Sequence, residues 1–71
     1  MKITGICSGI YEGADGFRSL GIEGISLVIP SEFDGELPVR GQYISARGRV
    51  AWRAGKPPVH FLEAWALSKE V

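Results

Sequence analysis

The chain has 71 residues, of which 45% are hydrophobic, and eight lysines and arginines balance eight aspartates and glutamates. A chain of this length forms one domain, residues 1–71, and buries only about 60% of the surface that its unfolded form exposes, which excludes a multidomain enzyme. The hydrophobic fraction and the zero net charge exclude a disordered chain.

Cysteine and histidine each occur once, which limits the covalent and metal chemistry of the chain. Cys7 has no second cysteine for an internal disulfide, and Cys7 with His60 does not supply the four ligands of a structural zinc site. The N-terminus lacks the apolar run of a signal peptide, and no window approaches the roughly 18 apolar residues of a membrane span. We therefore expect a cytoplasmic protein with no membrane segment, metal or small-molecule cofactor.

Glycine occurs ten times and interrupts every window in which a helix would run for three turns. Between the glycines lie short runs rich in Ile, Val, Tyr, Phe and Trp, separated by turn residues roughly every ten positions, as in small barrels and sandwiches. The sequence predicts an all-β fold with little or no helix and with strands at residues 2–11, 17–22, 25–29, 43–53 and 58–68.

The first three strands are separated by glycine-containing connections. Residues 12–16 contain two glycines and an aspartate, which suits a hairpin loop with residues at positive φ. Glu23-Gly24 is either a tight turn or a bend within one long strand.

Residues 30–41 form the longest connection, with two prolines and three acidic residues. Ser31 is a candidate N-cap for a single helical turn that ends near Gly35, because Pro38 prevents a longer helix. We expect Phe33 or Leu37 to close one end of the core.

Five strands with the longest connection between the third and the fourth follow the order of an OB-fold, a small, partly open Greek-key barrel. Residues 41–69 resemble the closing hairpin of the filamentous-phage helix-destabilising proteins, small OB-folds that bind single-stranded DNA. The resemblance is carried by Gly41-Gln42-Tyr43, Trp52-Arg53-Ala54-Gly55-Lys56-Pro57 and Val59-His60-Phe61-Leu62-Glu63-Ala64-Trp65. It implies an OB-like barrel, binding of single-stranded DNA, and a role in DNA replication in a bacterial or phage-infected cell.

The fourth strand separates into two different faces when its residues are assigned alternately. The face predicted to be apolar carries Ile44, Ala46, Gly48, Val50 and Trp52, and the opposite face carries Tyr43, Ser45, Arg47, Arg49, Ala51 and Arg53. Five basic residues and no acidic residue lie between positions 40 and 56, so the charge of this neutral chain is segregated.

Arginines at alternate strand positions suit phosphate contact, because the guanidinium fork binds phosphate oxygens in pairs and also stacks on bases. Stacking on an aromatic ring contributes about 1–3 kcal/mol per base and tolerates any sequence. We predict that Arg47, Arg49, Arg53 and Lys56 follow phosphates and that Tyr43 stacks a base. The competing interpretation is a solvated face whose arginines pair with Glu23, Glu63 or other acids.

Aromatic residues also surround the first hairpin loop, where OB-folds commonly bind their ligands. Phe17 and Arg18 follow the loop and extend the predicted site, and Tyr11 precedes it. Tyr11 and Phe17 suit stacking and core packing equally well.

The last strand is largely apolar on both faces, and simple alternation places Phe61 and Trp65 on the same one. These two side chains either fill the barrel or form a subunit interface, and we favour the core for Trp65. The apolar face of this strand that does not line the core is then available for a subunit contact, so we predict a homodimer. His60 is read as an ordinary strand residue, because it has no second metal or acid-base partner.

Catalysis has little support, because no histidine pairs with a nucleophile and no phosphate-cradling motif is present. The sequence predicts a non-catalytic protein that binds single-stranded nucleic acid with weak sequence preference, and it does not distinguish DNA from RNA. The alternative is a small barrel that serves as a protein-interaction or assembly module, which the neutral net charge favours.

Overall fold

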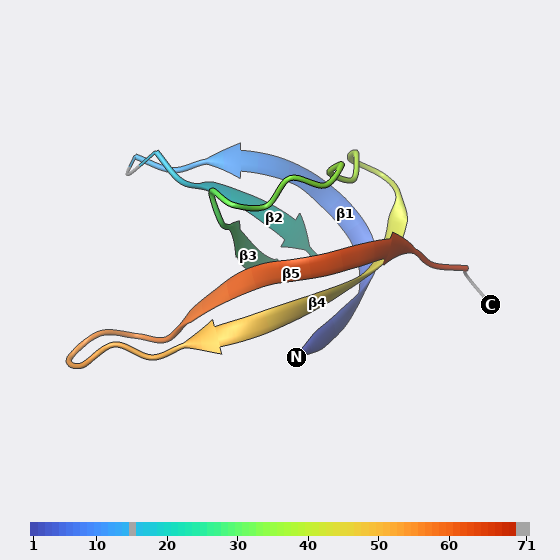
Figure 1. The fold of residues 1–71 in the computed structure, drawn as a ribbon. Coiled ribbons are helices and arrows are strands. Elements are labelled where there is room, and N and C mark those ends of the chain that lie inside the picture. Colours follow the sequence, from blue (N-terminus) through green and yellow to red (C-terminus); the bar gives the residue numbers. More distant parts are fainter. Residues whose placement is uncertain (15, 70–71) are drawn as a thin grey trace.

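The computed structural model describes residues 1–14 and 16–69. The strands are β1 (Lys2–Glu12), β2 (Arg18–Ile22), β3 (Ile25–Ile29), β4 (Tyr43–Ala51) and β5 (Val59–Leu67) (Figure 1). These bounds confirm the five predicted strands, although β4 and β5 are each slightly shorter than expected. The described part of the chain contains no helix, and therefore none that is long and apolar enough to cross a membrane.

The strands close into a barrel in the order β1-β2-β3-β5-β4. Neighbouring strands are antiparallel except β3 and β5, which run parallel and pair at Val28 and Phe61. The long β1 strand closes the barrel because its first half pairs with β4 and its second half with β2 (Figure 1). The predicted all-β, five-stranded, OB-like barrel is confirmed.

A β-bulge allows β1 to serve two partners. Cys7 pairs with Ile22 and Gly9 pairs with Gly21, so Ser8 is the extra residue between them. Gly9 has a φ of 130°, which a side chain rarely permits. Bulges bend a strand and increase its twist, and here the bend turns β1 from β4 towards β2.

The β2–β3 connection is a tight turn, which resolves the choice at Gly24. Glu23 and Gly24 both have positive φ, 49° and 80°, as a two-residue type I′ hairpin requires. The Glu23 carboxylate accepts a hydrogen bond of 3.0 Å from the Ile6 backbone N–H. Its side chain crosses Gly5, where a Cβ atom would collide with it. The turn is thereby tied to β1.

The predicted helical turn after Ser31 is wrong. The chain instead makes a turn in which the Phe33 N–H donates to the Pro30 carbonyl at 3.0 Å. The prediction for the core end is confirmed, because Phe33 and Leu37 are partly buried against the core. A single 3.0 Å bond holds this turn, and the glycine and proline that follow are poor helix formers.

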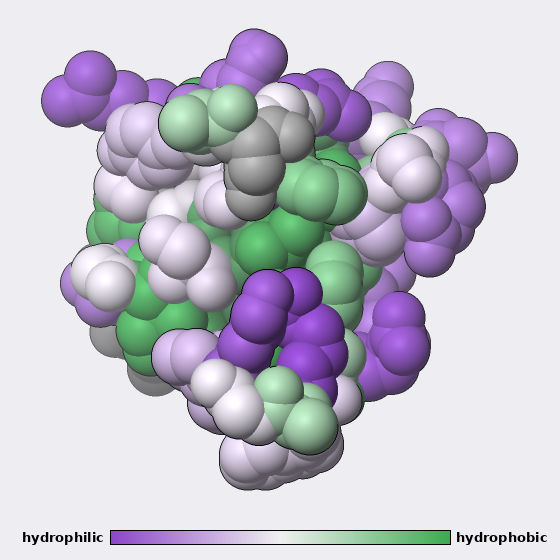
Figure 2. Space-filling view, turned by 90° about the vertical axis from the view of Figure 1, so that its left-hand side faces the viewer, coloured by the Kyte–Doolittle hydropathy of each residue, from purple (hydrophilic) through white to green (hydrophobic). Residues whose placement is uncertain are grey.

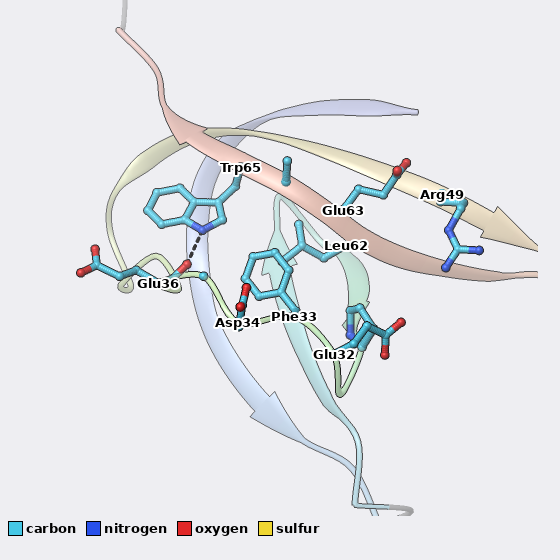
Figure 3. A pocket seen from close by; sticks show the side chains of 11 residues that line it. Glu32, Phe33, Asp34, Glu36, Arg49, Leu62, Glu63 and Trp65 are labelled. Carbon is cyan, nitrogen blue, oxygen red and sulfur yellow. Dashed lines mark hydrogen bonds between the residues drawn. The ribbon is translucent and has the colours of Figure 1, made fainter.

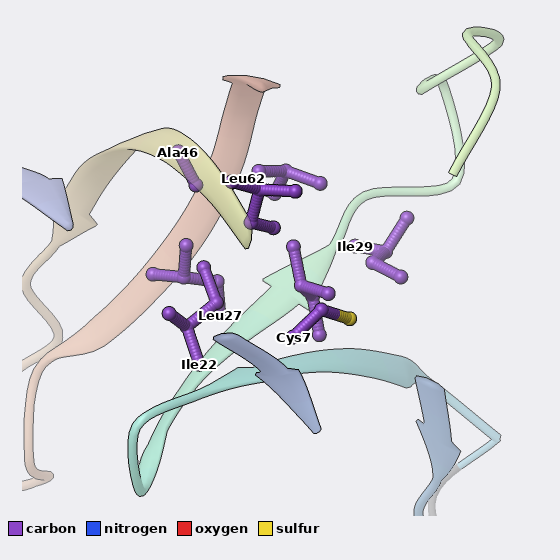
Figure 4. Close-up of a cluster of buried hydrophobic side chains, with 8 residues drawn as sticks. Cys7, Ile22, Leu27, Ile29, Ala46 and Leu62 are labelled. Carbon is purple, nitrogen blue, oxygen red and sulfur yellow. The ribbon is translucent and has the colours of Figure 1, made fainter. Parts of the chain in front are cut away.

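The core fills the barrel with eight buried side chains (Figure 4): Cys7, Leu20, Ile22, Leu27, Ile29, Ile44, Ala46 and Leu62. All five strands contribute, and β2, β3 and β4 do so at alternate positions, which confirms the apolar face predicted for residues 44 to 48.

A second bulge changes which side chains of β5 face the core. Arg47 pairs with Ala64 and Gly48 with Leu62, so Glu63 is unpaired. Because paired residues share a face, Trp65 lies on the inner side opposite buried Ala46, whereas Phe61 lies outside, opposite exposed Arg49. The expectation that Phe61 and Trp65 share a face is therefore wrong. The core assignment of Trp65 is confirmed, since it packs against the core.

Trp52 was placed on the apolar face of the fourth strand, and for this residue the prediction of burial is wrong. Its side chain is 77% exposed, because β4 ends at Ala51 and the chain continues into a hairpin that protrudes from the barrel (Figure 1). Alternation assigns a side chain to a face of the strand, but burial also requires the opposite side of the barrel to cover that face. The hairpin extends beyond the barrel, so the barrel does not cover Trp52.

Candidate nucleic-acid interface

A row of side chains crosses the outer surface of all five strands. Its members are successive pairing partners: Tyr11 on β1, Ser19 on β2, Val28 on β3, Phe61 on β5 and Arg49 on β4. Partners in adjacent strands lie on the same face, and the residues next to them in each strand, such as Leu20, Leu27 and Leu62, fill the core. We call these five residues the outer row.

Tyr11 begins the outer row with a ring that is held in place. A Cβ atom on Gly21 would lie 3.1 Å from the ring, and one on Gly9 would lie 3.6 Å from it, so the ring covers both glycines. The Tyr11 hydroxyl donates to the Ser8 carbonyl at 2.7 Å. The side chain nevertheless stays 53% exposed. One face of the ring therefore rests on backbone while the other is accessible to a stacking partner.

Phe61 and Arg49 form the other end of the outer row. The Arg49 guanidinium carbon lies 5.7 Å from the centre of the Phe61 ring, within the range of a cation–π contact. Within residues 1–14 and 16–69, no ion pair joins Arg49 to Glu63, which the competing interpretation made its partner. The carboxylate of Glu23 is bonded to β1 instead. The guanidinium is thus held beside an aromatic ring on the protein surface.

A groove lies beside the outer row, between the two protruding hairpins. Seen from the hairpin end, hydrophobic surface gathers in the middle of the molecule with hydrophilic groups around it (Figure 2). Phe17 contributes a ring that is 49% exposed. The groove, which we call the hairpin groove, is lined by Phe17, Val28, Ala51, Arg53, Val59 and Phe61.

Two more of the predicted basic residues lie near this surface. Arg47 is exposed two residues from Arg49 on the same face of β4, opposite Lys2 of β1. Lys56 is exposed at the tip of the β4–β5 hairpin, where its N–H donates to the Arg53 carbonyl at 3.2 Å and Gly55 has a φ of 71°. Together with Arg49 and Arg53 they form a basic edge along β4 and its hairpin.

Arg18 and Tyr43 are not brought into the outer row. Arg18 is the first residue of β2, pairs with the buried Ile29 and lines a recess at the mouth of the barrel. Tyr43 begins β4 opposite Ile6, partly buried, six residues or about 20 Å along the strand from Arg49. Alternation correctly puts Tyr43 on the face of the arginines but does not show that it lies at the opposite end of the strand.

Two aromatic residues of this region were not in the predicted site. The outward position of Phe61 depends on the bulge at Glu63, and the local sequence carries no signal for that bulge. Trp52 stands just before the Gly-Lys-Pro turn, and that turn was the available sign that it lies in a protruding hairpin. Among the described residues, no group of three or more His, Cys, Asp or Glu side chains is placed to hold a metal ion.

The chain matches no protein-family model, no curated protein and no solved structure. The candidate interface is therefore argued from its geometry alone. Three partly exposed aromatic rings and two arginines occupy the outer row and the hairpin groove, which correspond to the strand face and loops that bind ligands in OB-folds.

Proposed function

We propose that this protein binds single-stranded nucleic acid, DNA in the first instance, across the outer row and the hairpin groove. The observation that carries the proposal is the alignment of Tyr11, Phe61 and Arg49 across five strands. Rings that stack on any base, placed beside cations that bind phosphate, are the two elements of sequence-independent single-strand binding.

Each side chain has a distinct role in this proposal. Tyr11, Phe17 and Phe61 stack bases, and Tyr11 does so at low entropic cost because its ring is already fixed. Arg47, Arg49, Arg53 and Lys56 bind phosphates along the basic edge, while Arg18 extends the contact at the barrel mouth. Tyr43 lies too far along β4 to share a nucleotide with Phe61, so it serves only a longer strand.

The wider biological role follows from the resemblance of residues 41–69 alone. On that basis we propose a part in DNA replication, inside a bacterial or phage-infected cell. The predicted homodimer stays a prediction, and the sedimentation measurements described below also test it.

The first test is binding of a fluorescently labelled oligo-dT of about 20 nucleotides, which spans one to several OB sites. Anisotropy is measured at about 50 and 200 mM salt, because binding through phosphates weakens steeply between these concentrations. We expect binding at low salt that falls as salt rises. Absence of binding at low salt would overturn the proposed function.

Two substitutions separate charge from stacking. Arg49→Ala is expected to reduce the slope of log affinity against log salt by about 0.7, the value for one phosphate contact to a single strand. Phe61→Leu is expected to weaken binding by about 5-fold to 150-fold, the equivalent of one stacked base, with an unchanged slope. Arg40→Ala is the matched control, because Arg40 is exposed but lies in the connection before β4. An Arg40→Ala slope that drops as far as that of Arg49→Ala would remove Arg49 from the site.

A further inference from the structure

The β4–β5 hairpin carries an aromatic side chain that the outer row does not use. Trp52 is 77% exposed, and Arg53 and Lys56 follow it within the hairpin. Arg53 and Ala51 line the hairpin groove, so alternation places Trp52 on the other side of the hairpin. Exposed tryptophans flanked by cations are typical anchors of protein–protein interfaces.

A second groove lies on another part of the barrel, between β5 and the long connection (Figure 3). Phe33, Leu62, Ala64 and Trp65 supply apolar surface, and the Trp65 indole N–H donates to the Glu36 carbonyl at 2.6 Å, which holds the connection beside β5. Its cavity measures about 740 Å³. Four acidic residues line it, Glu32, Asp34, Glu36 and Glu63, together with Arg49. We call it the acidic groove.

We propose that the hairpin of one molecule docks into the acidic groove of a second copy of the same chain. Trp52 enters the apolar part of the groove, and Arg53 and Lys56 meet its carboxylates. The complementarity is strong because this neutral chain segregates its charges, with no acidic residue between positions 40 and 56 and three within 32–36. The hairpin projects away from its own barrel, so it does not reach its own groove (Figure 1).

In this head-to-tail arrangement each molecule docks its hairpin in one neighbour and receives the hairpin of another. Such heterologous contacts form rings or open chains of molecules, whereas two molecules that docked their hairpins reciprocally would close into a two-fold dimer. Arg49 belongs to the lining of the acidic groove and also to the outer row. A docked copy therefore lies next to the outer row of its neighbour. The inference does not rest on the proposed function, since the docking requires no nucleic acid.

The test is sedimentation of the wild-type chain at increasing concentration and low salt, without nucleic acid. We expect the mass to rise beyond two molecules and to fall again when salt screens the charges. Trp52→Ala and Lys56→Glu are each expected to weaken association about tenfold or more, as for a central interface residue. Arg40→Glu is the matched control, because it changes the net charge by the same amount outside both surfaces and is expected to leave association unchanged.

Mixing two variants tests whether the hairpin of one molecule docks in the groove of another. Trp52→Ala keeps the groove and Asp34→Lys keeps the hairpin. At a concentration at which the wild type just associates, each variant alone is expected to be mainly monomeric, while the mixture forms pairs that stop at two molecules. A wild-type chain that itself stops at two molecules would overturn the head-to-tail arrangement. A chain that stays monomeric at millimolar concentration, or one whose association ignores both Trp52→Ala and Lys56→Glu, would overturn the docking. Oligo-dT binding by such a monomer would leave the proposed function standing.

Discussion

At the scale of single residues, the outer surface of β1 depends on two glycines that a tyrosine covers. Gly9 and Gly21 are pairing partners, and a side chain at Gly21 would collide with Ser8 and crowd the Tyr11 ring. The glycines weaken the two strands, and the ring restores packing over them while its hydroxyl bonds to the Ser8 carbonyl. The same contacts fix a ring that remains half exposed, which links local stability to the proposed stacking.

Two substitutions of Tyr11 are therefore expected to affect stability and nucleic-acid binding differently. Tyr11→Phe removes the hydroxyl contact and is expected to lower the free energy of unfolding by about 0.5–1.5 kcal/mol in urea denaturation. Because the ring remains, oligo-dT affinity is expected to fall by less than about 5-fold, the lower limit for losing one stacked base. Tyr11→Ala removes the ring and is expected to exceed that limit. Equal losses of affinity in the two variants would show that the hydroxyl, not the ring, contacts the ligand.

At the scale of elements, the bulge at Glu63 determines the two faces of β5. Without the extra residue, a regular strand would place Phe61 and Trp65 on the same face. With it, Phe61 joins the outer row and Trp65 packs inside and binds the long connection through Glu36. One unpaired residue thus supplies both an outer ring and an inner anchor.

Deletion of Glu63 tests this explanation of β5. Removing the residue is expected to turn Trp65 outwards or to shift the pairing with β4, so the variant should lose its cooperative thermal transition and its near-ultraviolet tryptophan signal. Glu63→Ala keeps the bulge, and because the Glu63 side chain is exposed it should change stability by less than about 0.5 kcal/mol. A folded deletion variant with an unchanged Trp65 environment would contradict the proposed role of the bulge.

At the scale of the whole molecule, a small core supports the barrel and both protruding hairpins. A chain of 71 residues has a stability of about 4–10 kcal/mol at the usual value per residue. Eight buried side chains form the core, and the molecule extends 41 Å along its long axis but 21 Å across, because the hairpins project beyond the barrel. Loss of one large core side chain should therefore remove a considerable part of the free energy of unfolding.

Two leucines on β5 provide a matched comparison. Leu62 is 1% exposed and Leu67 is 66% exposed. Leu62→Ala is expected to cost about 2–5 kcal/mol, from lost burial and the cavity left behind. Leu67→Ala should cost less than about 0.5 kcal/mol. Urea denaturation measures both, and similar losses would place Leu67 in an interface that the isolated barrel does not contain.

Much of this architecture is readable in the sequence. The ten glycines, the alternation of apolar residues and the turn signals predict an all-β domain with five strands in nearly their observed positions. Alternation within β4 correctly separates Ile44 and Ala46 from Arg47 and Arg49, because the period of a strand is a local property.

The candidate site is less readable, because it is assembled from residues that pair across strands. The row from Tyr11 through Val28 to Arg49 depends on registers between strands far apart in the chain, and a bulge such as that at Glu63 shifts the register without a local signal. Trp52 is exposed because its hairpin extends past the end of the barrel. Its exposure therefore depends on the length of the hairpin relative to the barrel and not on the type of residue. The fold class, the strands and the segregation of charge can be predicted from the residues alone, because they follow from local conformational preference and composition. The positions of Tyr11, Phe61 and Trp65 were decided by strand pairing, because only the closed barrel brings distant residues onto a common face.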